Sequence, residues 1–313
     1  MTGKFYSHGK LLITGEYVVL DGAMALAIPS RFGQSLEIEA NHDNKIHWTA
    51  LDHKGNEWFK TSLILKGGEL IFAEGNTHPT EPESRLLQVL TEALKLNSEV
   101  LNSQSGLNVT TKLEFPQNWG LGSSSTFINN VAQWFRIDPY ELLKNTFGGS
   151  GYDIAAAQNE EPITFQLTKE KQSVLISNFD PSFKDQLFFV HLNRKQNSRA
   201  SIAHYKAQST ARVNDTVARI SALTDSFISC NNIEEFALLI EIHETLISKL
   251  INTPKVKSTQ FPDFPGAIKS LGGWGGDFIL ATGGQDEMDY FREKGYTTIV
   301  SYEEMVKNKT PQV

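Results

Sequence analysis

The chain has 313 residues, of which 40% are hydrophobic and 21% are charged, and its formal net charge is −7. A chain of this length predicts about two globular domains. The acidic balance argues against a nucleic-acid partner that is bound through a broad positive field. Cys230 is the one cysteine, which excludes an intrachain disulfide and a cysteine metal site. The N-terminal segment lacks the pattern of a secretory signal, and no apolar run reaches the ~18 residues of a membrane helix. We therefore expect a cytoplasmic protein without a membrane partner.

Alternating hydrophobic residues at the start of the chain predict strands over 5–13, 17–20 and 24–29, with a tight hairpin at Asp21-Gly22. The same alternation predicts strands over 34–40, 45–51 and 106–115. A period of 3.6 residues predicts a helix over 83–97. A second helix is expected to end near Phe135.

Asp138 is a good start for a further helix, because its side chain can cap the helix and Pro139 fits the first turn. A short alanine-rich helix follows at Asp153, and strands are expected over 162–167, 173–176 and 185–192. Two long helices are predicted over about 198–229 and 232–251, then a strand after 277, a helix over 286–295 and a strand over 296–300. This mixture predicts an α+β fold with a boundary between residues 170 and 185.

The stretch Gly120-Leu121-Gly122-Ser123-Ser124-Ser125 joins a predicted strand to a predicted helix. Glycines let the backbone approach an anion closely, and the start of a helix adds unpaired N–H groups. Serine hydroxyls can donate to phosphate oxygens or ligate Mg²⁺. The stretch is therefore a candidate phosphate cradle, with a plain serine-capped turn as the alternative. It is not a P-loop, since no Lys-Ser/Thr pair closes it, and Ser125 stands where a dinucleotide fingerprint has its third glycine.

Two more glycine-rich stretches and one lysine complete the candidate chemistry. Asp153 follows Gly148-Gly149-Ser150-Gly151-Tyr152, and it either caps a helix or directs a carboxylate at a substrate hydroxyl. Four glycines in five positions, from Gly272 to Gly276, indicate backbone that passes close to a ligand, against a simple bulge as the alternative. Lys10 lies in an apolar region, where it either reaches the surface or pairs with an acid.

In this order and spacing, the residues resemble the GHMP kinase superfamily. The first motif of that family resembles Gly9-Lys10 through Gly15-Glu16-Tyr17, and the second, Pro-x-x-x-Gly-Leu-Gly-Ser-Ser, is matched at each position from Pro116 to Ser124. The third resembles Lys269 to Asp277. Ser150, Gly151 and Asp153 match a segment of the mevalonate-type members. The resemblance covers nearly the whole chain.

The resemblance implies a two-domain GHMP kinase fold. A ribosomal S5 domain 2-like, ATP-binding domain would cover residues 1–175, and a ferredoxin-like domain would cover residues 176–313. ATP and Mg²⁺ would be the cofactors, and the nucleotide would contact Pro116, Gly120, Leu121, Gly122, Ser123, Ser124 and Ser125. Asp153 would accept or orient the proton of the acceptor group. Lys10 beside it would lower the pKa of Asp153 and neutralise charge that develops in phosphoryl transfer.

The resemblance also implies that one of Ser123 or Ser124 helps to hold Mg²⁺, with Glu141 as the acidic metal ligand. A small, anionic substrate would be bound by Glu16, Tyr17, Ser150, Gly151, Lys195, Ser198, Arg199, Gly273, Gly275 and Gly276. Together with Arg194, the cations of this set suit a phosphorylated or carboxylated acceptor, with a solvated basic loop as the alternative. Trp274 stands where the family usually has glycine, so either the loop geometry differs or the ring packs on the substrate.

Tyr17 stands where mevalonate kinases typically have histidine. The segments "GEYVVL" and "GSGYDIAAA" and the Gly-Gly-Asp ending at Asp277 resemble phosphomevalonate kinases more closely. We therefore expect an ATP-dependent kinase of the mevalonate pathway, hence of isoprenoid biosynthesis, with 5-phosphomevalonate ahead of mevalonate as the acceptor. A diphosphomevalonate decarboxylase of the same superfamily and a non-catalytic nucleotide-binding regulator are the alternatives. A nicotinamide-dependent dehydrogenase is disfavoured by the missing third glycine.

Overall fold

A computed structural model describes residues 2–73, 77–101, 106–168, 171–194, 198–208 and 210–307. The chain packs into two compact units that are interleaved along the sequence. The first unit contains Met1–Gly9, Phe32–Gln117 and Gly122–Gln158, and the second contains Lys10–Arg31, Asn118–Leu121 and Asn159–Val313. The predicted division after residue 175 is a division along the sequence and stays a prediction.

The first unit is built on a sheet in the order β5-β4-β3-β6-β2, with β1 also paired to β2. The strands are β1 (Gly3–Leu12), β2 (Ala25–Asn41), β3 (Ile46–Leu51), β4 (Glu57–Lys66), β5 (Glu69–Phe72) and β6 (Gly106–Leu113). β3 pairs with β6 in parallel, whereas β2–β6, β3–β4 and β4–β5 are antiparallel. β2 is one strand of 17 residues where the sequence predicts two, and only its part from Phe32 onward belongs to the first unit.

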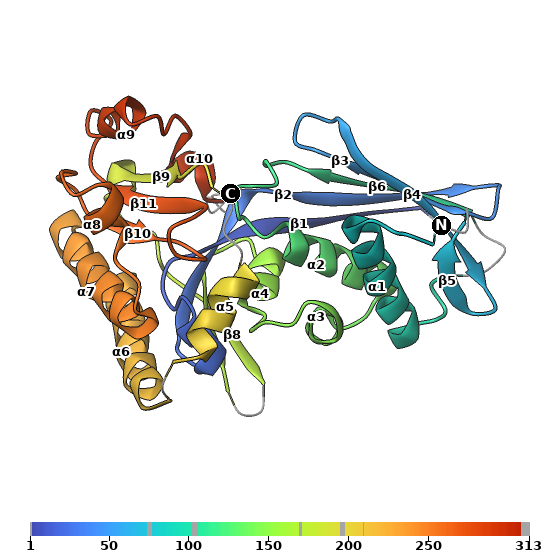
Figure 1. The fold of residues 1–313 in the computed structure, drawn as a ribbon, viewed down its shortest axis with the longest axis horizontal. Helices are drawn as coiled ribbons and strands as arrows, with labels where there is room; N and C mark the ends of the chain where they lie inside the picture. Colours follow the sequence, from blue (N-terminus) through green and yellow to red (C-terminus); the bar gives the residue numbers. More distant parts are fainter. Residues whose placement is uncertain are drawn as a thin grey trace, which may run out of the picture. The chain divides into compact units, whose positions relative to one another are not determined.

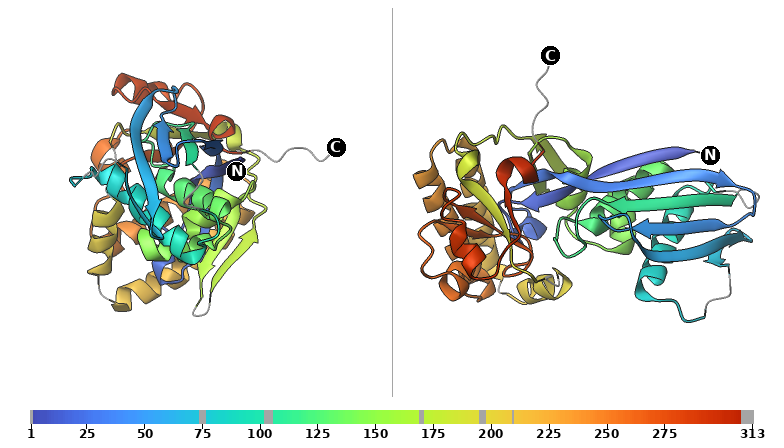
Figure 2. Two further views of the ribbon diagram at one scale, coloured as in Figure 1. Left: turned by 90° about the vertical axis from the view of Figure 1, so that its right-hand side faces the viewer. Right: turned by 90° about the horizontal axis from the view of Figure 1, so that it is seen from above.

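Helices cover one face of this sheet (Figures 1 and 2). They are α1 (Glu81–Leu96), α2 (Ser123–Phe135), α3 (Pro139–Thr146) and α4 (Tyr152–Gln158). α1 begins at a capping box between Thr80 and Glu83, two residues before the predicted start. Apolar side chains of the sheet, such as Val109, pack against helix residues such as Leu90 and Ile128, which are fully buried. α2 packs on both α3 and α4, so these helices belong to one packed core.

The second unit contains a four-stranded antiparallel sheet in the order β10-β11-β9-β12. Its strands are β9 (Leu187–His191), β10 (Ile268–Ser270), β11 (Phe278–Thr282) and β12 (Ile299–Ser301). α6 (Thr210–Ser229) packs on α7 (Ile233–Ile251), and α7 packs on β10 (Figure 1). The shorter helices are α5 (Ser198–Lys206), α8 (Val256–Gln260), α9 (Asp289–Glu293) and α10 (Tyr302–Met305). The pair β7 (Ile163–Leu167) and β8 (Gln172–Ile176) extends the first residues of β2.

The predicted strand over 17–20 and its hairpin are wrong. Residues Val18–Asp21 form a 3₁₀-helix, η1, between Tyr17 at φ 64° and Gly22 at φ 90°. Val18 and Val19 are buried in the core of the second unit, so the apolar run reflects burial rather than an extended strand. The alternating pattern and the Asp-Gly pair are short signals that tertiary packing overrides here.

Other predicted boundaries shift. The long helix predicted over 198–229 is two helices, because a turn at residues 207–208 separates α5 from α6. The helix predicted over 286–295 is limited to α9, and the strand predicted over 296–300 begins at Ile299. β4 and β5 are not predicted at all, because most side chains of β4 are exposed or half-buried and leave no clear alternation. Within the described ranges, no helix is long and apolar enough to cross a membrane.

Candidate functional site

The start of α2 leaves backbone N–H groups open to an anion. Gly122 is the N-cap residue at φ 86°, and it provides no side-chain cap. The first intrahelical bond runs from Thr126 N to Gly122 O at 3.0 Å, so the N–H groups of Ser123 to Ser125 have no acceptor within the helix. These donors and the partial positive charge of the helix start suit a phosphate.

The three serines of this stretch differ in what their hydroxyls can reach. Ser124 is exposed and Ser123 is half-buried. Ser125 is only 1% exposed, and its Oγ donates to Gly122 O at 2.8 Å. The hydroxyl of Ser125 therefore closes the turn, whereas those of Ser123 and Ser124 are accessible to a ligand. Pro116 is half-buried ahead of this loop.

Asp153 is the second residue of α4 and not its cap. Its side chain is half-buried, and Oδ1 accepts from Ile154 N at 3.1 Å. The helix start is fixed by Gly151 at φ 88°, where a Cβ atom would lie 2.8 Å from the ring of Tyr140. Burial, and then the charges of Asp138 and Asp153, raise the pKa of Tyr140 to about 12. Asp153 thus lies near the neutral phenol of Tyr140. Ser150 is buried, and its Oγ accepts a hydrogen bond from Tyr152 N.

The described residues show fewer features of a metal site than of a phosphate site. Glu141 is exposed in the first turn of α3, the helix that packs against α2. In the part of the chain that the structure describes, no three His, Cys, Asp or Glu side chains form a metal-binding group. Mg²⁺ usually takes only one or two protein ligands and completes its shell with water and phosphate oxygens. One of Ser123 or Ser124 together with Glu141 would match that sparse pattern, and this assignment stays a prediction.

In the second unit, Lys10 holds the two residues that precede Gly122. Its backbone N–H donates to Leu121 O at 2.9 Å, and its Nζ donates to Gly120 O at 3.0 Å. Lys10 and Asp153 belong to different units, so their predicted approach stays a prediction.

The third glycine stretch reaches Gly120 through Asp277. Gly120 has φ 67°, and a Cβ atom there would lie 2.4 Å from the carboxyl carbon of Asp277. Asp277 itself has φ 51°, and its backbone bonds to Leu192 N at 2.7 Å and Arg194 O at 2.9 Å hold it in place. Lys10, Gly120 and Asp277 line a cavity of about 20 Å³, enough for about one water molecule. Within the second unit alone, this space is too small for a phosphate group.

Trp274 packs in the protein core. Trp274 is 5% exposed, and its Nε1 donates to Pro254 O at 3.0 Å. It packs in the same hydrophobic cluster as Tyr17 and Ile247. Its φ of 57° is uncommon for a bulky residue. Of the two interpretations of Trp274, the structure therefore favours an altered loop geometry over a ring that packs on the substrate. Gly273, Gly275 and Gly276 lie in the same stretch, and Gly275 has φ 81°.

Glu16 and Tyr17, predicted to bind substrate, are 1% and 8% exposed. Glu16 Oε1 lies 2.5 Å from Lys269 Nζ, and the ring of Tyr17 stacks on Tyr205 with centroids 5.6 Å apart. Burial raises the pKa of Tyr17 to about 12. Both side chains contact protein, which disfavours direct contact with a substrate.

The predicted basic cluster is only partly visible. Lys195 lies outside the described residues, and so do the side chains of Ser198 and Arg199 at the start of α5. The cluster therefore stays a prediction. Sequence reasoning missed Ser201 on the same helix, whose Oγ donates to Gly273 O at 3.3 Å and which also hydrogen-bonds Tyr17. Its spacing of one helical turn from Ser198 was the available signal.

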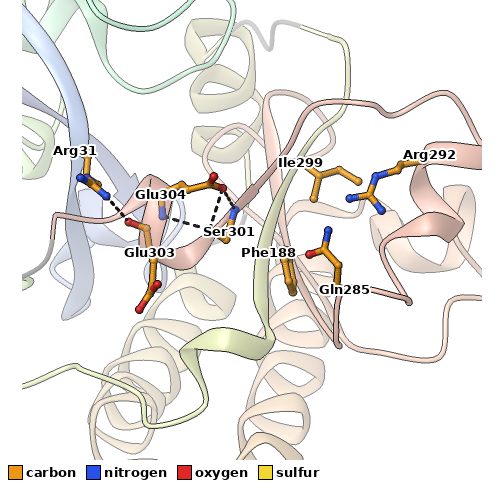
Figure 3. Close-up of a pocket in the computed structure, with 8 residues that line it drawn as sticks. All are labelled: Arg31, Phe188, Gln285, Arg292, Ile299, Ser301, Glu303 and Glu304. Carbon is orange, nitrogen blue, oxygen red and sulfur yellow. Dashed lines mark hydrogen bonds between the residues drawn. The ribbon is translucent and has the colours of Figure 1, made fainter.

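A larger concavity of about 520 Å³ lies on the β12 side of the second unit's sheet (Figure 3). It is lined by Arg31, Phe188, Gln285, Arg292, Ile299, Ser301, Glu303 and Glu304. Arg31 donates to the Glu303 carbonyl at 3.1 Å, and Arg292 pairs with Asp289 at 2.5 Å. Because both arginines are engaged and two carboxylates line the space, it suits a phosphate poorly. The glycine stretches of the two units remain the candidate ligand-binding segments.

No protein-family model and no curated protein matches the chain. Solved structures match it over nearly its whole length, and three of them have sequence identities of 12% to 16%. A mevalonate kinase has a TM-score of 0.70 at 16% identity, covering 98% of this chain and 100% of that chain. The Lactococcus lactis galactokinase complexed with galactose has 0.69 at 12%, covering 100% and 95%. The Streptococcus pneumoniae phosphomevalonate kinase, in complex with phosphomevalonate and AMPPNP, has 0.60 at 15%, covering 96% and 99%.

These proteins are GHMP kinases, and this chain has their fold. The predicted α+β GHMP kinase fold is confirmed.

Proposed function

We propose that this chain is an ATP-dependent kinase that phosphorylates a small anionic molecule. The observation that carries the proposal is the start of α2, where Gly122 leaves the helix uncapped and two accessible serines follow it. Such a helix start is a ready anion site. It occurs in a chain with the fold of the GHMP kinases, one of which was solved with the nucleotide analogue AMPPNP. The same fold supports ATP as the donor.

The residues of the loop divide the work of holding magnesium ATP, which supplies the γ-phosphoryl group when bound. The backbone N–H groups of Ser123 to Ser125 would bind phosphate oxygens, with Pro116 and Gly120 to Gly122 shaping the loop. The hydroxyl of Ser123 or of Ser124 and the carboxylate of Glu141 would hold Mg²⁺.

Asp153 would accept or orient the proton of the acceptor hydroxyl. Its side chain is half-buried, and the residue lies in the first turn of α4, which packs in the core of the first unit. Lys10 would offset the negative charge that builds up on the transferred group. Phosphoryl transfer depends on positioning and charge stabilisation more than on many reacting side chains. These two groups therefore suffice as the catalytic pair.

The favoured acceptor is 5-phosphomevalonate, and mevalonate is the second candidate. Tyr17 and the Gly-Gly-Asp ending at Asp277 support this order only through their resemblance to phosphomevalonate kinases. The basic residues Arg194, Lys195 and Arg199 suit a phosphorylated acceptor. A phosphomevalonate kinase and a mevalonate kinase are among the solved structures with this fold. Because galactokinase shares it as well, the fold alone does not select the acceptor.

A coupled assay of ADP release tests the proposal with mevalonate, 5-phosphomevalonate, diphosphomevalonate, homoserine and galactose as acceptors. We expect turnover with 5-phosphomevalonate and no release of CO₂. CO₂ release from diphosphomevalonate would instead indicate a decarboxylase. ATP binding without turnover of any acceptor would indicate a regulator.

The same assay tests Asp153. Asp153→Asn should lower kcat by about 10²-fold or more while the affinity for MgAMPPNP is retained. Asp263→Asn is the matched control, because Asp263 is an exposed surface residue. Near-full turnover of Asp153→Asn would remove Asp153 from the mechanism.

A further inference from the structure

A group of charged side chains lies wholly inside the second unit. The Nζ of Lys269 lies 2.5 Å from Glu16 Oε1 and 3.5 Å from Glu244 Oε1. Ser270 Oγ donates to Glu244 Oε2 at 2.9 Å. The side chains of Glu16 and Lys269 are 0% exposed and that of Glu244 is 1% exposed. No part of this group reaches solvent, so its role is inside the fold.

The group joins three segments that are far apart along the chain. Glu16 lies in the turn that follows β1, Glu244 lies in α7, and Lys269 lies in β10. The turn is also bound to α7 directly, because Gly15 N donates to His243 Nε2 at 3.3 Å. β10 ends at Ser270, and the third glycine stretch, residues 271–277, begins at the next residue. The charged group thus lies at the N-terminal end of that stretch.

One ammonium group cannot neutralise two buried carboxylates, and a buried charge without compensation is strongly unfavourable. Burial raises the pKa of Glu16 and raises that of Glu244 to about 7, against the opposing effect of Lys269. Burial and the charge of Lys269 lower the pKa of His243, so this ring is neutral. The two carboxyl groups therefore share one proton near neutral pH.

The groups that face Glu244 come from each surrounding segment. Lys269 and Ser270 face it from β10, and Glu16 faces it from the turn after β1. His243 is its neighbour on α7, and from α6 the ring of Phe227 packs edge-on against His243 at 6.2 Å. Glu16 Oε2 lies 3.2 Å from His243 Nε2, the atom that accepts the Gly15 N–H.

We propose that Glu16, Glu244 and Lys269 are positioning residues that set the conformation of the glycine stretch 271–277, and that they do so while the two carboxyl groups hold one proton. The stretch contains Trp274 at φ 57° and Asp277 at φ 51°, and such residues persist only where their surroundings hold them. Loss of the proton buries a net negative charge beside Ser270. The hydrogen bond from Ser270 to the ionised carboxylate becomes stronger, but the buried net charge is unfavourable, so the group opens toward water and the stretch loses its anchor.

The test is ¹⁹F NMR of the full chain labelled with 5-fluorotryptophan, in which Trp274→Phe identifies the resonance of Trp274. In the wild type we expect this resonance to shift with pH, with a midpoint near 7. Glu244→Gln keeps the shape and the hydrogen bond of the protonated acid, so its resonance should stay at the low-pH position throughout. Glu241→Gln, an exposed position on the same helix, should titrate like the wild type. A resonance that does not titrate in the wild type, or that titrates equally in Glu244→Gln, would overturn the inference.

A second variant guards against an effect peculiar to position 244. Glu16→Gln also removes one of the two carboxylates, so the remaining acid is matched by Lys269 and the titration near pH 7 should disappear. Persistence of the titration in this variant would show that the two carboxyl groups do not share a proton.

The effect on catalysis rests on the proposed function. Between pH 6.5 and 8.5, the KM for MgATP should rise about fivefold more in the wild type than in Glu244→Gln, with kcat changed equally in both. The KM ratio isolates the protein, because the titration of ATP itself is common to both enzymes. Equal KM profiles alongside the expected NMR result would overturn the link from the stretch to the nucleotide. If no acceptor is turned over at all, the proposed function fails, while the NMR result still decides the conformational claim.

Discussion

The carboxylate of Asp277 lies directly against Gly120, so closely that a Cβ atom at position 120 would stand 2.4 Å from the carboxyl carbon. Asp277 is held at φ 51° by backbone bonds to Leu192 and Arg194 at the end of β9. From the other direction, Lys10 donates to the carbonyl of Gly120. The first glycine of the candidate phosphate loop is therefore held between one acid and one base of the second unit.

Replacement of Gly120 by alanine tests this close approach against a control with the same backbone. Gly120 and Gly148 both have φ 67°, but a Cβ atom at 148 would meet nothing within 4 Å. Gly148→Ala should cost about 1–2 kcal/mol of unfolding free energy, the usual cost of a left-handed conformation. Gly120→Ala should cost about 1–3 kcal/mol more because of the clash. Urea denaturation measures both.

The clash can also be relieved from its other side. Asp277→Gly removes the carboxylate and suits the positive φ at that position. In the background of Gly120→Ala it should therefore recover part of the lost stability. Equal costs for the two alanine variants, or no recovery in the double variant, would contradict the contact between Gly120 and Asp277.

Alanine substitutions of Ser124 and Ser125 should differ in their effects on nucleotide binding and on protein stability. Ser124→Ala should weaken binding of MgAMPPNP in calorimetry and leave the unfolding free energy within about 0.5 kcal/mol of the wild type, because Ser124 is exposed. Ser125→Ala should cost about 1 kcal/mol of stability, because it removes the bond to Gly122 O. A larger loss of nucleotide affinity in Ser125→Ala than in Ser124→Ala would reverse this assignment.

Glu244 should make stability fall with rising pH. Its pKa is raised from 4.5 to about 7 in the folded state. The folded chain therefore binds more protons than the unfolded chain between these values, and this contribution to stability, complete below pH 4.5, is lost above pH 7. At about 1.4 kcal/mol per pKa unit, the loss is about 3 kcal/mol.

Comparison with Glu244→Gln isolates this contribution. His243, whose pKa is lowered, acts in the opposite direction, because the unfolded chain takes up its proton below pH 6.5. The raised pKa of Glu16 acts in the same direction as that of Glu244. The wild-type curve alone therefore mixes several effects. Denaturant unfolding at pH 5 and pH 8 should show Glu244→Gln gaining about 3 kcal/mol on the wild type from low to high pH. Glu241→Gln should run parallel to the wild type, and a parallel curve for Glu244→Gln as well would refute the shift.

Replacement of Trp274 by glycine should destabilise the protein less than replacement by alanine. The opposite order is expected for a tryptophan within a helix. Both variants lose the buried ring, which costs about 3–5 kcal/mol, but Trp274→Gly also relieves the positive φ of 57°. Trp274→Gly should therefore be about 1 kcal/mol more stable than Trp274→Ala. Trp134 is the control, since it is buried within α2, where glycine should be about 1 kcal/mol worse than alanine. The same order at both positions would contradict the backbone geometry of the glycine stretch.

The strongly periodic elements were predictable from the sequence. The helix predicted over about 232–251 is α7, Ile233–Ile251, and the strand predicted over 45–51 is β3, Ile46–Leu51. Each buries one regular face, so its pattern is written in neighbouring residues. The 3₁₀-helix at Val18–Asp21 was not predictable, because Val18 is buried in a cluster with residues such as Ile247 that are remote in sequence.

The candidate site divides in the same way. The glycine and serine motifs, the acid at 153 and the lysine at 10 could be selected from the sequence as candidates, because the flexibility and hydrogen-bonding capacity of a residue are properties of its type. Only the tertiary structure showed that Ser125 is buried while Ser124 is exposed, and that Glu16 pairs with Lys269, 253 residues away. Burial and charge pairing depend on which distant segments pack together, and a local sequence pattern does not specify that packing.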